Sequence, residues 1–326
     1  MNMIVWTGEK EEATLWFNNI VHCPHVVRRR GCLKHQDLIP DHSLIQFKSL
    51  KKLVVRECNR CSVISGMVKD LMPGNMGRNL TSLTWIGRNP EVMKLSTCIR
   101  LTELKLFGIT YMPTLLHVPP GRMVTLTIHF GGCTKGTRRQ MQQFVAVVAG
   151  MVNLRSLELV GMESFHRAGW DSQSFLRLGD TLRSLQHVVL ALPFKDDKGF
   201  LADFLVRRLA GNNPQLKTFS FNGANLSDES LESLSRLKML QVVDISMQHF
   251  GTGGVMKLLL GQSRHQYRKV RLQTFLNLGP GESYKEWVAA AFLRFREATT
   301  GTIGKPLHKL ACDDGNLPEF TITKIA

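Results

Sequence analysis

A short apolar pattern, Leu-x-x-Leu-x-Leu with other apolar residues in some copies, recurs nine times along this chain of 326 residues. The last two apolar positions of each copy are two residues apart, so they lie on the same side of a short β-strand, and the first packs where the strand begins. The copies are Leu50/Leu53/Val55, Leu80/Leu83/Trp85, Leu101/Leu104/Leu106, Met123/Leu126/Ile128, Leu154/Leu157/Leu159, Leu185/Val188/Leu190, Leu216/Phe219/Phe221, Leu240/Val243/Ile245 and Tyr267/Val270/Leu272. Successive first positions are 30, 21, 22, 31, 31, 31, 24 and 27 residues apart. The pattern predicts nine strands built on one repeating unit.

The segments between the strands predict helices. One such strand cannot bury its apolar side alone, whereas a parallel stack of strands makes a continuous core, with the connections returning along the other side. Residues 137–152 and 197–210 carry apolar side chains at helical spacing, and Gly211 is placed to end the second helix. Ser227 is expected to begin a third. The period and the alternation predict an α/β leucine-rich-repeat solenoid, a horseshoe with parallel strands on its concave face and helices on its convex face.

The turn that leaves each strand departs from the consensus of such repeats. The consensus places Asn or Cys three residues after the final Leu, where the side chain satisfies buried backbone groups. Here these positions are occupied by Cys58, Arg88, Ile109, Gly131, Met162, Pro193, Ala224, Gln248 and Phe275. Only Cys58 and Gln248 can serve that purpose. Irregular turns and uneven curvature are therefore expected.

From Leu50 to Phe275 the sequence resembles the intracellular leucine-rich repeats of ribonuclease-inhibitor type found in NLR immune receptors and in F-box substrate receptors. The best match is LKTFSFNGANLSDESLESLSRLKMLQVVDIS, residues 216–246, where strand, turn, helix start and next strand follow in order. The resemblance implies either the ligand-sensing or autoinhibitory region of an NLR-type receptor or the substrate-recognition subunit of a ubiquitin ligase. The chain contains no nucleotide-binding segment and no recognisable F-box, so the choice between them stays open.

The predicted organisation is an N-terminal cap over residues 1–46, repeats over 47–278, and a C-terminal cap helix with a last repeat over 279–326. Both caps are predicted because a solenoid must shield its terminal core. In the N-terminal segment Trp6, Leu15, Trp16 and Ile20 can cover the first repeat.

At the C-terminal end, Ser283 and Glu286 form a capping-box signature for an apolar helix. A docking helix for a partner is the alternative interpretation, and it requires an exposed apolar stripe. Leu307, Leu310 and Cys312 predict a tenth, imperfect strand.

The net charge of +16 suggests nucleic acid as a partner, because phosphates attract a basic protein regardless of sequence. The residues expected on the concave face contribute only +2 of this excess, and they include no series of aromatic residues on which bases could stack. Basic blocks lie elsewhere, at 28–30, at 135–139, and at Arg264 with Arg268. Nucleic-acid binding through these blocks is therefore kept as an alternative to a protein partner.

The middle of the expected concave face combines apolar side chains with hydroxyls, histidines and a carboxylate, which is typical of a protein interface. The residues proposed to bind a partner are Ile86, Phe107, His129, Glu158, Val160, His187 and Val189. The alternative is that neighbouring side chains or a loop cover these groups. The sequence thus predicts a protein-binding scaffold.

Residues for catalysis do not form any familiar motif. Residues 131–137, GGCTKGT, have the paired glycines of a phosphate loop, but Thr137 stands where the lysine belongs, so a turn between strand and helix is expected. Cys58 and Cys61 have the spacing of a zinc knuckle, and a structural zinc is an unfavoured alternative because no second Cys-x-x-Cys accompanies them. The chain is predicted to be no enzyme, with no cofactor, no metal and no small-molecule substrate.

Seven scattered cysteines are expected to be reduced thiols, as in the cytosol or nucleus. The N-terminal MNMIVWTGEKEEATLW has acidic residues where a signal peptide needs an apolar core. A cytoplasmic protein is therefore predicted, with the nucleus as the alternative and no membrane association.

Overall fold

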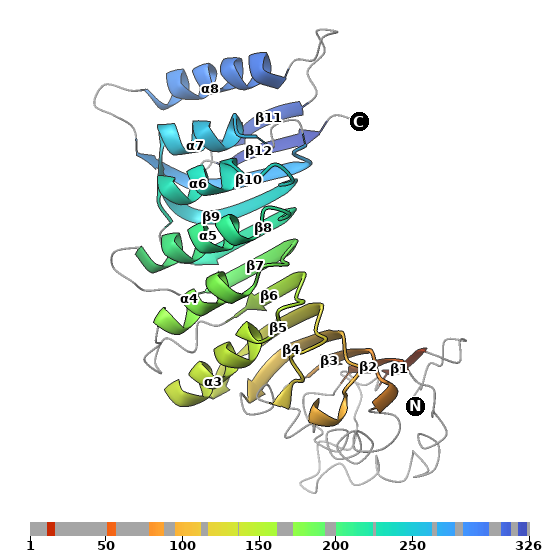
Figure 1. Ribbon diagram of the computed structural model, residues 1–326. Helices are drawn as coiled ribbons and strands as arrows, with labels where there is room; N and C mark the ends of the chain where they lie inside the picture. The colour runs from red at the N-terminus through yellow and green to blue at the C-terminus, as the bar shows by residue number, and fades with distance from the viewer. Residues whose placement is uncertain are drawn as a thin grey trace, which may run out of the picture. The chain divides into compact units, whose positions relative to one another are not determined.

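The structure is a computed structural model in which strands alternate with helices along much of the chain (Figure 1). The chain divides into two compact units. The first unit comprises Met1–Asn153 with Arg167–Trp170, and the second comprises Leu154–His166 with Asp171–Ala326. The residues that the structure describes are 12–16, 51–56, 78–87, 95–111, 117–135, 137–161, 172–192, 200–223, 226–262, 266–277, 283–299, 308–313 and 319–324.

The first unit contains five parallel strands that pair in the order of the chain. They are β1 (Glu12–Trp16), β2 (Lys52–Arg56), β3 (Ser82–Ile86), β4 (Glu103–Tyr111) and β5 (Thr125–Lys135). The repeat leucines are register partners, with Leu53 opposite Leu83, Leu83 opposite Leu104, and Leu104 opposite Leu126. The strands therefore stack in the phase that the apolar pattern predicts.

The second unit continues the same arrangement. Its parallel strands are β6 (Ser156–Val160), β7 (His187–Leu192), β8 (Thr218–Gly223), β9 (Val242–Gly251) and β10 (Lys269–Asn277). Leu157, Val188, Phe219, Val243 and Val270 are successive register partners. Every apolar position of the nine copies whose side chain the structure describes is buried; Leu50 and Val55 of the first copy lie outside the described side chains.

Helices return the chain from one strand to the next, and their length follows the length of the repeat. The 31-residue repeats contain α3 (Arg138–Ala149), α4 (Ser172–Thr181) and α5 (Phe200–Asn212). The repeats of 24 and 27 residues contain the shorter α6 (Asp228–Ser235) and α7 (Thr252–Leu259). The 21-residue repeat between β3 and β4 includes a 3-10 helix, η2 (Leu95–Thr97). A short repeat leaves too few residues for a full α-helical return.

The local signals that predict helices are confirmed at three places. Thr137 caps α3, its Oγ1 accepting a hydrogen bond from the Gln140 N–H while the Gln140 side chain accepts one from the Thr137 N–H. Ser227 caps α6 by one hydrogen bond, which its side-chain oxygen accepts from the Glu229 N–H. The second predicted helix forms as α5, although it runs one residue past Gly211.

These features define the fold class as an α/β leucine-rich-repeat fold. In each unit, one side of the strands is buried and carries the repeat leucines. Phe130 of β5 meets Phe144 of α3 edge to face, with ring centroids 6.1 Å apart, and Tyr267 donates a hydrogen bond to the Leu258 carbonyl of α7 at 2.8 Å. The core thus lies between strands and helices, as the sequence predicts.

Where the described strands are long, backbone pairing with the next strand takes the role of the consensus Asn or Cys that most of these repeats lack. In β4 and β5 pairing shifts register after Phe107 and resumes at Ile109, whose side chain is fully buried. In β9 and β10 it shifts after Leu272 and continues from Thr274 to Asn277. Backbone groups at these consensus positions therefore bond to the neighbouring repeat instead of to an Asn side chain, and the expected irregular turns take the form of register shifts.

The two ends of the chain differ from the sequence-based expectation. Within the predicted N-terminal cap, β1 adds a strand beside β2 that the pattern did not indicate. The prediction of a tenth repeat strand is wrong in the place of that strand, which does not pair with β10. β11 (His308–Asp313) forms, but it pairs antiparallel with β12 (Glu319–Lys324), and β12 pairs antiparallel with β10. Only five residues separate β11 from β12, fewer than a parallel crossover needs.

Candidate functional site

The strand residues that alternate with the buried leucines form a partly exposed face in each unit, which we call the open face. It corresponds to the face that the sequence analysis assigned to partner binding. In β3 and in β6 the described side chains alternate strictly between half-buried and buried. The period of two places all seven predicted site residues on this face, three in the first unit and four in the second.

In the first unit, Ile86, Phe107 and His129 form one row across three strands. Ile86 is the register partner of Phe107, and Phe107 is the register partner of His129. The rings of Phe107 and His129 meet edge to face, with centroids 4.7 Å apart and planes at 67°. All three side chains are half-buried. The row is a small apolar surface with a polar ring at one end.

A charged network lies on the same face, nearer the start of the strands. Glu103 accepts a hydrogen bond from the Ser82 hydroxyl at 2.8 Å and pairs with the Lys105 ammonium at 2.6 Å. The hydrogen bond from Lys105 is the main cause that lowers the pKa of the Glu103 carboxyl, against an opposing effect of partial burial. These charges enter the net charge expected for the face, but the sequence pattern does not indicate that they form an ion pair. The pairing leaves the Phe107 row with a polar border.

In the second unit, Glu158 of β6 and Val189 of β7 are register partners. Both are half-buried, as is Val160 at the end of β6. Val189 is in turn opposite Ser220 of β8. The predicted apolar residues of this unit thus lie among hydroxyl and carboxylate side chains.

His187 lies at the start of β7 and is exposed. Its Nδ1 is 3.0 Å from the Thr218 hydroxyl of β8, and either atom can donate, depending on the imidazole tautomer. Partial desolvation is the main cause that lowers the pKa of His187 below its usual 6.5, and the charge of Lys217 acts in the same direction. His187 is therefore biased toward its neutral form.

An ion pair between β9 and β10 lies at one end of the open face of the second unit, and it was not among the predicted site residues. Arg271 Nε donates to Asp244 Oδ1 at 2.9 Å, and the two are register partners on β10 and β9. Both side chains are about one third exposed or less. The signal was present in the sequence, because opposite charges stand at equivalent positions of successive repeats.

The predicted site residues are thus gathered into two sets. Ile86, Phe107 and His129 form a contiguous row in the first unit, and the remaining four lie on β6 and β7 of the second. That both sets contact a single partner stays a prediction.

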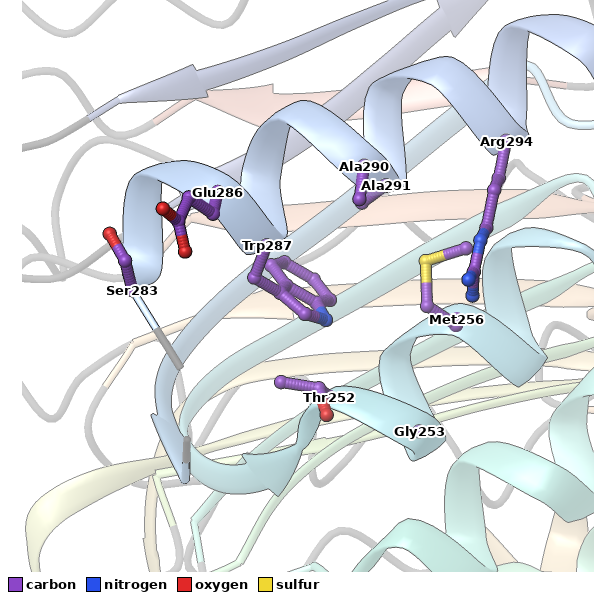
Figure 2. A pocket seen from close by; sticks show the side chains of 9 residues that line it. All are labelled: Thr252, Gly253, Met256, Ser283, Glu286, Trp287, Ala290, Ala291 and Arg294. Carbon is purple, nitrogen blue, oxygen red and sulfur yellow. The ribbon is translucent and has the colours of Figure 1, made fainter. Parts of the chain in front are cut away.

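A groove of about 380 Å³ lies between α7 and α8 (Tyr284–Thr299) of the second unit (Figure 2). Trp287 of α8 reaches toward Thr252 of α7, while Arg294 and Met256 lie near each other farther along the groove. The lining residues are Thr252, Gly253, Met256, Ser283, Glu286, Trp287, Ala290, Ala291 and Arg294. The groove is shallow and mixed in polarity.

The burial pattern of α8 favours the cap interpretation over the docking helix. Ala291 and Phe295 are each only 2% exposed, and Trp287 and Val288 are half-buried. Leu293, by contrast, is 58% exposed and stands alone among the described residues of the helix as an exposed large apolar side chain. The apolar stripe that a partner would bind is thus largely used within the chain.

The candidate chemical motifs do not form sites in the described residues. Gly131–Lys135 belong to β5, and Thr137 is occupied as the cap of α3, so the paired glycines form no phosphate loop. The cysteines of the zinc alternative, with Trp6, Ile20 and the first basic block, lie outside the described residues. Within the described ranges no cluster of three His, Cys, Asp or Glu side chains could hold a metal ion.

Of the helices the structure describes, none is both long and apolar enough to cross a bilayer.

Comparisons with known proteins give similarity in structure only. No model of a known protein family matches the chain. No curated protein matches it in sequence either. Among solved structures, an internalin, inlF, from Listeria monocytogenes is similar at 15% identity and a TM-score of 0.35, over 73% of this chain and 70% of that one.

A second similar structure is the leucine-rich-repeat ectodomain of the plant membrane receptor kinase GASSHO1/SCHENGEN3 from Arabidopsis thaliana, in complex with CASPARIAN STRIP INTEGRITY FACTOR 2. It is 14% identical with a TM-score of 0.30, over 67% of this chain, which spans 30% of that ectodomain's length. The assignment to the leucine-rich-repeat class rests on the strand register and repeat phase described above. Proteins of this class are typically scaffolds that bind other proteins and have no catalytic role.

Proposed function

We propose that this protein is a non-enzymatic scaffold that binds a protein partner on the open face. The observation that carries the proposal is the row formed by Ile86, Phe107 and His129, in which apolar and aromatic groups are half-exposed side by side. An apolar centre with a polar border is characteristic of protein interfaces, and aromatic side chains contribute much of their binding energy. Glu158, Val160, His187 and Val189, on the open face of the second unit, are proposed to contact the partner as well.

The cellular setting is proposed from the resemblance of the repeats. The favoured setting is the ligand-sensing or autoinhibitory region of an NLR-type immune receptor, because the long and uneven repeats resemble that family. The second is substrate recognition in an F-box type ubiquitin ligase. Both settings are intracellular, with a cytoplasmic location favoured over a nuclear one. The first setting predicts association with a nucleotide-binding module, and the second predicts co-purification with ligase core components.

The test is affinity purification from cell lysate with the Phe107→Asp/Val160→Asp variant, at moderate and high salt and after nuclease treatment. Aspartate at these half-buried positions puts a charge into the proposed interface, so a partner bound by the wild type is expected to be lost. Gln143→Asp, on the exposed side of α3, is the matched control and should retain the partner.

Both variants should first show the circular dichroism spectrum and melting behaviour of the wild type. A folded Phe107→Asp/Val160→Asp variant that still retains the partner would rule out the open face as the binding site. The identity of the captured protein then decides between the two settings.

A further inference from the structure

The residues that precede the strands of the second unit form a hydrogen-bonded ladder. The carbonyl of Arg155 accepts hydrogen bonds from the N–H groups of Gln186 and His187, at 2.7 and 3.0 Å. The carbonyl of Gln186 accepts from Lys217 and Thr218 in the same way. The pattern repeats from Lys217 to Gln241 and from Gln241 to Arg268. Residues 24 to 31 positions apart in sequence are therefore immediate neighbours in space.

This ladder carries long polar or cationic side chains in every repeat, in the order Arg155, Gln186, Lys217, Gln241 and Arg268. Two further cations, Arg183 and Lys238, lie in the connections that lead into β7 and β9. We call Arg155, Arg183, Lys217, Lys238 and Arg268 the basic edge. All are exposed except Lys217, which is half-buried.

No carboxylate opposes the basic edge from its own segments. The connections into β6–β10 comprise residues 154–156, 181–187, 212–218, 236–242 and 266–269. Together these five segments contain seven Lys and Arg residues and no Asp or Glu. Acidic side chains of this unit pair with other residues: Asp180 with Arg208, Asp244 with Arg271, and Glu232 with Lys257 and Arg236. Arg236 is one of the seven cations of the connections, but it is not part of the basic edge. Within the described part of the chain, none of the five cations of the basic edge forms an ion pair. The row therefore carries a local excess of positive charge, which attracts an anionic partner.

The dimensions of the row suit an extended polyanion. Neighbouring strands of a sheet are about 5 Å apart, so the ladder from Arg155 to Arg268 crosses four spacings, or roughly 20 Å. Arg155, Lys217 and Arg268 therefore stand on the ladder at every second repeat, and Arg183 and Lys238 lie in the connections of the repeats between them. A nucleic-acid strand likewise presents one phosphate per nucleotide along a line.

The composition of the row favours nucleic acid over a protein or a membrane. Three of the five cations are arginines, whose planar guanidinium can donate two hydrogen bonds to one phosphate. Met239, 41% exposed, is the one exposed large apolar side chain in the five connections of this unit. Protein interfaces have an apolar centre and membrane anchors bury apolar groups, whereas nucleic-acid interfaces are polar and positively charged.

We propose that the basic edge of the second unit binds the phosphate backbone of single-stranded nucleic acid. The cations position the strand through its phosphates, and the amides of Gln186 and Gln241 add donors between them. No aromatic side chain belongs to the row, so binding is independent of base sequence and strongly dependent on salt. This surface consists of residues that differ from those of the open face, and it does not depend on the proposed protein partner.

The test is binding of a fluorescent oligouridylate of about 15 nucleotides to the full chain over a range of salt concentrations. Five phosphate contacts predict a slope of log K against log salt of about −3.5. The Arg155→Gln/Lys217→Gln/Arg268→Gln variant is expected to lose at least about tenfold in affinity and to reduce that slope by about 2. The Arg177→Gln/Arg207→Gln/Arg294→Gln variant, with the same change in charge on exposed positions of α4, α5 and α8, should bind like the wild type.

Equal weakening by both triple variants would overturn the proposal, because attraction would then depend only on net charge. So would wild-type affinity in the basic-edge variant, or binding of a poly-glutamate peptide or phosphatidylserine vesicles in place of the oligonucleotide. Tighter binding of a duplex of the same length would overturn the assignment of a single strand as the ligand. If the triple variant does not fold, Arg183→Gln/Lys238→Gln tests the same row. The Phe107→Asp/Val160→Asp variant should bind oligouridylate normally, which separates this surface from the open face.

Discussion

Asp228 Oδ1 accepts a hydrogen bond from the Gly251 N–H at 2.7 Å, so a carboxylate in the first turn of α6 caps the N-terminus of α7. Gly251 has no side chain with which to cap its own helix. The preceding pair of helices repeats the arrangement, since Asp203 of α5 accepts from the Ser227 N–H at 2.8 Å and from the Ser230 hydroxyl. Each carboxylate also faces the positive end of a helix dipole. Helix starts in this part of the chain are therefore stabilised by the neighbouring repeat.

Gly251→Ser is predicted to destabilise the protein when residue 228 is Asp and to stabilise it when residue 228 is Ala. In the native chain a Cβ at position 251 overlaps the Asp228 carboxylate, so Gly251→Ser should destabilise the protein. Asp228→Ala removes the cap and should cost about 1 kcal/mol. In that background Gly251→Ser supplies its own cap and should recover most of the loss. Urea unfolding of the four proteins gives the coupling, and additive effects would contradict the interrepeat cap.

Asn213 is predicted to contribute strongly to the free energy of unfolding because its buried amide hydrogen-bonds to two repeats. Its Oδ1 accepts from the Leu185 N–H at 2.7 Å, and its Nδ2 donates to the Leu182 and Leu209 carbonyls at 2.8 and 2.9 Å. Asn213→Leu leaves these groups unsatisfied in the core and should cost about 3 kcal/mol. Asn212→Ala, which removes one half-buried bond to the Gly179 carbonyl, should cost about 1 kcal/mol. Equal losses in thermal or urea unfolding would show that burial of the amide does not matter.

The pKa of His187 is predicted to lie below 6.5, and the cause can be tested by substitution. Desolvation is the larger effect and the Lys217 charge the smaller. Lys217→Gln should therefore raise the pKa without restoring it fully, as followed by NMR titration of the ring proton. A histidine pKa lowered by folding means that stability is retained above the unfolded value and declines as the pH falls from about 6.5 through the folded pKa. His187→Gln should flatten that decline, and a pKa above 6.5 would contradict the assignment.

The Cys98 thiol is predicted to be unreactive in the folded protein. Burial raises its pKa to about 11, so almost no thiolate is present at neutral pH, and reagents cannot reach the buried sulfur. Iodoacetamide labelling followed by peptide mapping should modify Cys98 only after denaturation. Labelling of Cys98 under native conditions, at a rate similar to that of a free thiol, would show that this part of the first unit opens readily.

Much of the fold is predictable from the sequence because the repeats are local and periodic. The alternation of apolar residues fixes which face of each strand is buried, so Leu157 and Leu159 could be assigned to the core and Glu158 to the open face. Helix signals were sufficient where they were strong, as at Thr137 and Ser227. They failed for α7, whose first turn contains two glycines and whose cap comes from Asp228 in another repeat.

The sequence by itself determined the repeat class, the strand register and the side of each strand that faces the core, since these follow from spacings of a few residues. Only the tertiary structure decided which polar groups of different repeats meet. The length of each return sets that alignment, so the Asp228 carboxylate of α6 reaches the Gly251 N–H, and the Asn213 amide joins backbone groups of two repeats. β12 likewise runs antiparallel to β11 because the connection between them is too short for a crossover, and it takes the place beside β10. Contacts across some 20 to 30 residues depend on how the chain returns, which a periodic pattern does not specify.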